Sequence, residues 1–128
     1  MYDYLLTIAE EEDVLVDEIP FKSNAKGLCH GNILGINKKI KTQAEKACVL
    51  AEELGHYFTG CGDILEQNTV PNIKQELKAR EWAYKKLITP SDLFSALKHG
   101  VHNKFELAEH LNITEDFLQE AIDFFKSK

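Results

Sequence analysis

Three residues in the middle of the sequence, Glu52, Glu53 and His56, have the types and the spacing of a metal-binding site. On a helix, the four-residue separation of Glu52 and His56 places both side chains on one face, one turn apart. Glu53 then projects about 100° around the helix from Glu52. The H-E-x-x-H motif has this arrangement: its outer residues hold zinc, and its inner glutamate activates a water molecule.

The first position of the motif is occupied by Glu52 instead of histidine. A carboxylate is a legitimate zinc ligand, but a site with more oxygen donors also accepts manganese or iron. The spacing alone leaves a second interpretation open, in which Glu52 and Glu53 are solvated helix charges and His56 is a partly buried residue near the helix end.

A third ligand must come from another part of the chain, and Glu76 is the candidate. It precedes Ala79, Ala83 and Leu87 by three, seven and eleven residues, so on a helix it shares their apolar face. A carboxylate on such a face is expected to be paired or metal-bound, because burying it alone is costly. The alternative is a first-turn glutamate that only favours the helix N-terminus.

The N-terminal third is predicted to form a short helix and a small antiparallel sheet. Apolar residues at helical spacing lie between residues 2 and 12, and short apolar runs follow between residues 14 and 36. Gly31 and Asn32 supply a hairpin turn between the last two runs. We expect residues 32–37 to form an edge strand beside the site, where backbone pairing could hold an extended peptide.

The rest of the chain is predicted to be helical. Thr42 and Glu45 have capping-box spacing, so the motif helix begins there and ends near Phe58. A second helix covers about residues 73–88 and stops before a proline. Three shorter helices follow, with predicted N-terminal caps at Thr89, Asn103 and Thr114.

The last two helices have the spacing of a helix-turn-helix motif, whose second helix could bind DNA. That helix is acidic, however, because it carries Glu115, Asp116, Glu120 and Asp123 where contacts to DNA phosphates need lysine or arginine. We therefore expect a packing or protein-docking role for this pair, without direct DNA binding.

Composition indicates a single domain over residues 1–128. Within it, we expect residues 1–88 to form the sheet and the active-site helices, and residues 89–128 to form a helical extension. A hydrophobic fraction of 44% suits one packed core, and a net charge of −6 works against binding to nucleic acid or anionic membranes. The three cysteines lack C-x-x-C spacing, so neither a disulfide framework nor a four-cysteine zinc site is indicated. Without a signal sequence or a long apolar run, we expect a cytoplasmic protein.

The residues around the motif resemble the ImmA/IrrE family of metallopeptidases, which occur in phages, integrative elements and their bacterial hosts. Residues 50–60, LAEELGHYFTG, are similar to the family's H-E-L-G-H segment and the residues after it. Glu76, Ala79, Trp82 and Ala83 fit the family's E-x-x-A-x-x-F-A helix. The resemblance extends from the predicted hairpin through both of these helices.

This resemblance implies a zincin-like α+β fold in which Glu53 is the catalytic base and His56, Glu76 and Glu52 are the metal ligands. It also implies a metal-dependent endopeptidase of a phage or mobile element that cleaves a repressor-type transcriptional regulator. The alternative is a weakly active or inactive peptidase-like module that binds a repressor or another regulatory protein. Zinc is the expected metal, held less tightly than by two histidines, so it can be lost during purification.

Overall fold

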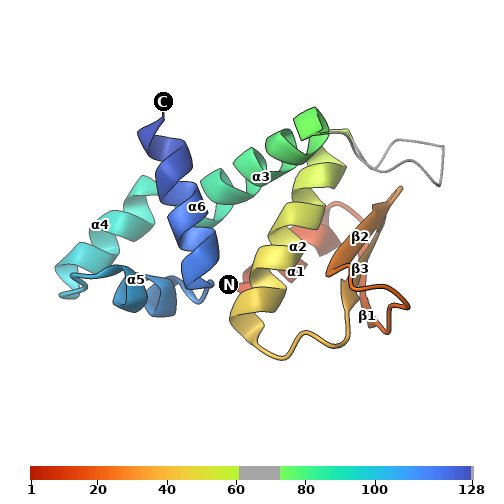
Figure 1. Cartoon of the computed structure of the whole chain (residues 1–128), viewed down its shortest axis with the longest axis horizontal. Helices are drawn as coiled ribbons and strands as arrows, with labels where there is room; N and C mark the ends of the chain where they lie inside the picture. The colour runs from red at the N-terminus through yellow and green to blue at the C-terminus, as the bar shows by residue number, and fades with distance from the viewer. Residues whose placement is uncertain (61–72, 128) are drawn as a thin grey trace.

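The computed structural model describes residues 1–60 and 73–127 and has the α+β architecture that the sequence predicts. One helix comes first in the chain, the strands of a small sheet follow, and the remaining elements are helices (Figure 1). The elements are α1 (Tyr2–Glu11), β1 (Leu15–Ile19), β2 (Gly27–His30), β3 (Ile33–Asn37), α2 (Gln43–Phe58), α3 (Ile73–Leu87), α4 (Pro90–Lys98), α5 (Lys104–Leu111) and α6 (Glu115–Lys126).

The sheet has the strand order β1-β3-β2 and is mixed, which corrects the prediction of a wholly antiparallel sheet. Strands β2 and β3 form the predicted antiparallel hairpin, and Gly31 in its turn has a φ of 59°. Strand β1 pairs with β3 in parallel. The connection after β1 explains this parallel pairing. Residues 20–26 carry the chain past one strand position to β2, and the β2–β3 hairpin then returns it so that β3 lies between β1 and β2.

The prediction that residues 32–37 form an edge strand was wrong. Strand β3 lies in the centre of the sheet, and its Leu34 and Ile36 side chains are fully buried. This strand contains the most apolar run of the three, and a central position lets both of its backbone edges form hydrogen bonds. The edge strand that contacts the motif helix is β2.

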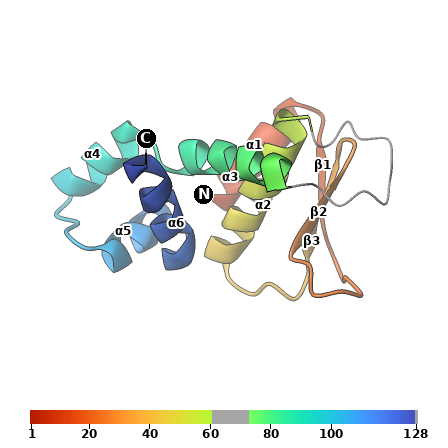
Figure 2. The same ribbon diagram turned by 45° about the horizontal axis from the view of Figure 1, so that its top comes forward.

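Helices α1 and α2 lie on one side of the sheet (Figures 1 and 2). Helix α2 begins as predicted, because the Thr42 side chain accepts a hydrogen bond from the Glu45 backbone N–H at 3.2 Å. The core between these helices, the sheet and the later helices contains fully buried large side chains: Leu5, Leu34, Ile36, Leu50, Leu54, Leu87 and Leu118.

The C-terminal helices lie at the opposite end of the molecule from the sheet, with α2 and α3 between (Figure 2). The Tyr84 ring of α3 packs against Phe117 and Phe124 of α6, with ring centroids 5.2 and 5.5 Å apart. The predicted caps at Thr89, Asn103 and Thr114 are confirmed. Within the described residues, no helix has the length and apolar character needed to span a membrane.

Candidate active site

Helices α2 and α3 form the framework of the candidate site. Helix α3 starts beside the end of α2 and runs back across it (Figure 1). Their closest approach is at Gly55, where an added β-carbon would collide with the backbone carbonyl oxygen of Ala79. Glycine at this point lets the two backbones approach, so the side chains around the contact face each other across it.

His56 and Glu76 meet across this helix contact. His56 lies in the last turn of α2 with only 4% of its surface exposed, and Glu76 lies in the first turn of α3. The distance from His56 Nε2 to Glu76 Oε1 is 3.2 Å. Two ligands of one tetrahedral zinc ion at roughly 2.0–2.1 Å are about 3.3 Å apart, so this separation suits a shared ion as well as a hydrogen bond.

Glu53 is partly buried beside this pair, with its carboxyl group against the edge strand β2. A β-carbon on Gly27 would lie only 2.8 Å from Glu53 Oε2, so the missing side chain of Gly27 makes room for the carboxyl group. Burial, followed by the charges of Glu52 and Glu76, raises the pKa of Glu53 to about 8. In this arrangement the carboxyl group keeps its proton at neutral pH.

Glu52 is turned toward Arg80 on α3. Its Oε1 atom accepts a hydrogen bond from Arg80 Nε at 2.9 Å. This hydrogen bond is the main reason that the pKa of Arg80 lies above its usual value. One oxygen of the carboxylate at the first motif position is therefore held by a guanidinium group, and the role of Glu52 as a metal ligand stays a prediction.

The donor set fits a divalent cation in part. His56 and Glu76 already converge, and imidazole with carboxylate is an ordinary combination for zinc. In the part of the chain that the structure describes, no three His, Cys, Asp or Glu side chains are grouped closely enough to hold a metal ion. Among the described residues, Glu52 is the candidate for a third ligand at this place, and it would have to turn from Arg80 toward His56 and Glu76.

The second ring nitrogen of His56 is unsatisfied. Its Nδ1 atom is buried and has no hydrogen-bond partner among residues 1–60 and 73–127. Leaving a buried polar group without a partner costs about 1–3 kcal/mol, and native proteins contain few such groups. A fold that tolerates this cost at His56 indicates that the imidazole is kept for a purpose other than stability.

Sequence reasoning missed two residues that shape the site, Arg80 and Gly27. A signal for Arg80 was present, because it follows Glu76 by four residues just as Glu52 precedes His56 by four. Helices α2 and α3 run in opposite directions where they cross. Four residues back along α2 and four forward along α3 therefore lead from the His56–Glu76 contact to the Glu52–Arg80 contact. Gly27 gave no signal, since its role depends on how the sheet docks against α2.

Comparison with known proteins places the chain in a family. No curated protein and no solved structure matches it. The family described as Peptidase_M78, IrrE N-terminal-like domain, matches residues 9–123 of the 128 residues, a span that includes all of α2 and α3. This match confirms the resemblance of the motif residues to the ImmA/IrrE family, and the chain therefore belongs to the Peptidase_M78 family of IrrE N-terminal-like domains.

Proposed function

We propose that this metallopeptidase-like domain is a metal-dependent endopeptidase that cleaves a repressor-type transcriptional regulator of a phage or mobile element. The supporting observation is the buried carboxyl group of Glu53 beside the converging side chains of His56 and Glu76. Family membership supports the metallopeptidase class. The repressor as substrate and the phage setting follow from the resemblance to the ImmA/IrrE family.

In this proposal His56 and Glu76 hold the metal, expected to be zinc, and Glu52 joins them as the third ligand. A bound divalent cation would supply Lewis acidity at the scissile carbonyl group. A bound cation would also favour the ionised form of Glu53, and that carboxylate would act as the general base, taking a proton from the attacking water and delivering it to the leaving amine. Gly27 positions Glu53 for this task by leaving space at the edge strand.

Strand β2 offers a place for the substrate. It is an edge strand that contacts α2, and within the described residues it pairs only with β3. An extended peptide could add to the side of β2 that faces away from β3, with main-chain hydrogen bonds for affinity. Because Gly27 lies in β2 against Glu53, such a peptide would pass beside the proposed base.

A binding module is the second candidate, and the ion pair between Glu52 and Arg80 favours it. If Glu52 stays with Arg80, only two of the three predicted ligands remain for a metal ion. The same edge strand could then hold a segment of a repressor or another regulatory protein without cleaving it.

The experiment that separates the two candidates uses Glu53→Gln. This change keeps the size and hydrogen-bonding shape of the side chain but removes the proton acceptor. Cleavage of a candidate repressor-type regulator should fall on the order of 10²-fold or more, since general-base catalysis typically contributes 10² to 10⁴. Glu109→Gln, an exposed change on α5, is the matched control and should cleave like the wild type.

Zinc content and peptide-bond cleavage are measured together. Glu52→His should tighten zinc binding and maintain or increase cleavage if the natural site is a weakened peptidase. The enzyme proposal is abandoned for the binding module if the wild type cleaves nothing, Glu53→Gln binds the regulator as the wild type does, and Glu52→His gains zinc without gaining activity.

A further inference from the structure

Two contacts join the facing sides of α2 and α3, one helical turn apart. His56 meets Glu76 at 3.2 Å, and Glu52 meets Arg80 at 2.9 Å. The first contact is made by two candidate metal ligands, whereas the second joins a candidate ligand to a cation that belongs to the protein. Glu52 is thus the residue for which two positive charges compete.

We propose that Arg80 competes with the metal ion for Glu52 and thereby keeps the zinc affinity of this site low. The proposal rests on the proposed metal-binding roles of His56 and Glu76. Arg80 is a positioning residue here, because it acts through Glu52 and touches neither metal nor substrate.

The chemistry of arginine suits this role. A guanidinium group does not lose its proton in proteins, so its positive charge persists and disfavours a second cation nearby. Its contact with Glu52 is made through Nε, and 47% of the Arg80 side chain is exposed. Arg80 can therefore swing into solvent without leaving a buried charge behind, which makes the competition reversible.

The test is a titration of the full chain with Zn²⁺ alone, against a competing chromophoric chelator at constant pH and ionic strength. Arg80→Gln should bind zinc on the order of tenfold more tightly than the wild type, because zinc no longer has to displace a hydrogen bond between charged groups, which is worth roughly one such factor. Arg80→Lys keeps the charge beside Glu52 and should restore the low affinity of the wild type.

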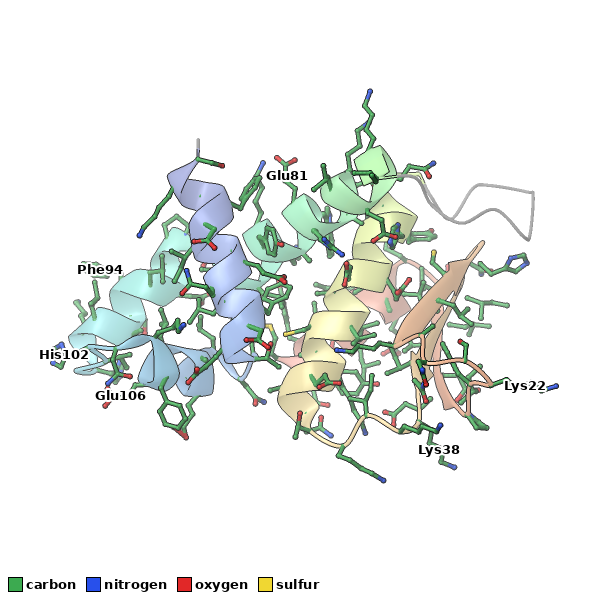
Figure 3. The ribbon with its side chains drawn as sticks, viewed as in Figure 1. Lys22, Lys38, Glu81, Phe94, His102 and Glu106 are labelled. Atoms are coloured by element: carbon green, nitrogen blue, oxygen red, sulfur yellow. The ribbon has the colours of Figure 1, made fainter. Side chains whose placement is uncertain are left out.

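Lys85→Gln is the matched control. It removes one positive charge from the same helix, but Lys85 pairs with Glu81 at 2.9 Å, and Glu81 points outward from α3 (Figure 3). Its zinc affinity should equal that of the wild type. If Lys85→Gln raised zinc affinity as much as Arg80→Gln does, the proposal would be overturned, because the change in net charge alone would then explain both results.

Glu52→Gln tests whether Arg80 acts through Glu52. In the Glu52→Gln background, Arg80→Gln should no longer raise zinc affinity, because the carboxylate for which Arg80 competes is gone. A tenfold gain from Arg80→Gln in that background would overturn the proposal by showing that Arg80 acts without Glu52.

His56→Ala distinguishes failure of this proposal from failure of the proposed function. If His56→Ala no longer binds zinc, while Arg80→Gln binds zinc no more tightly than the wild type, the metal site stands and the role of Arg80 is refuted. If zinc binding survives His56→Ala, the proposed metal site is itself refuted, and the competition with it.

Discussion

The helix pair α2–α3 and the C-terminal helices α4–α6 use their polar side chains differently. In the first region, His56 is buried and Glu53 partly buried, and ionisable groups meet across the helix contact. In the second, polar side chains cap the starts of all three helices, while Phe117 and Leu118 are buried against the rest of the core. The far end of this region carries Phe94 and His102 on its surface (Figure 3).

The difference shows where this fold gives up stability. A capped helix with an apolar face satisfies local propensity, hydrogen bonding and burial together, so its sequence and structure agree at every level. The region around α2 breaks that agreement, because the carboxyl group of Glu53 is desolvated and His56 Nδ1 has no hydrogen-bond partner within the described residues. Such conflicts are expected at functional sites, so they make this region a candidate site on grounds that do not use the family match.

The largest effect is expected from Gly55→Ala, which attacks the helix contact of the site region. The new β-carbon would meet the Ala79 carbonyl oxygen, a backbone atom that cannot move without shifting α3. We expect a loss of about 3 kcal/mol in the free energy of unfolding, as for overpacking of a core. Urea unfolding followed by circular dichroism measures this change.

Gly35→Ala is the control for that substitution. Its β-carbon would lie 3.1 Å from Leu28 Cγ, part of a flexible side chain that can give way. We expect a distinctly smaller loss than for Gly55→Ala. Equal losses for the two variants would mean that the α2–α3 contact is no tighter than an ordinary place in the sheet.

Local signals in the sequence were sufficient to predict the helices and the hairpin. Thr42, Thr89, Asn103 and Thr114 mark helix starts because their side chains satisfy backbone donors within three residues, a requirement that does not depend on the rest of the fold. The parallel pairing of β1 with β3 was beyond such signals, since it depends on which way residues 20–26 cross the sheet.

The candidate site could be predicted only to the level of its residue types. Helical periodicity placed Glu76 on the apolar face of its helix, and four-residue spacing from Glu52 singled out His56; the structure brings these two side chains together. Periodicity could not show that Glu52 contacts Arg80 rather than a metal ion. That outcome depends on how the two helices cross in three dimensions. A carboxylate in a ligand position is compatible with either a metal ion or an arginine.

An intermediate effect is expected from Thr114→Ala in the C-terminal region. The Thr114 hydroxyl accepts a hydrogen bond from the Phe117 backbone N–H at 3.1 Å and caps α6. Losing a threonine cap costs about 1 kcal/mol in the free energy of unfolding. Thr114→Ser keeps the hydroxyl and should unfold close to the wild type in urea. If both variants lose the same stability, the methyl group rather than the cap is responsible.

The smallest loss is expected from His56→Leu, although His56 is among the most buried polar residues described. Leucine forfeits the contact with Glu76, but Glu76 is partly exposed and can be hydrated instead. The same change removes the unsatisfied Nδ1, whose burial costs about 1–3 kcal/mol, and adds apolar surface to the core. The net change in the free energy of unfolding should therefore lie within about 1 kcal/mol of zero, or be stabilising.

Urea unfolding without added metal measures the effect of His56→Leu, with Leu54→Ala as the control that should lose about 3 kcal/mol from the same helix. A loss of about 2 kcal/mol or more in His56→Leu would show that His56 stabilises the fold, and the contrast between the two regions would fail.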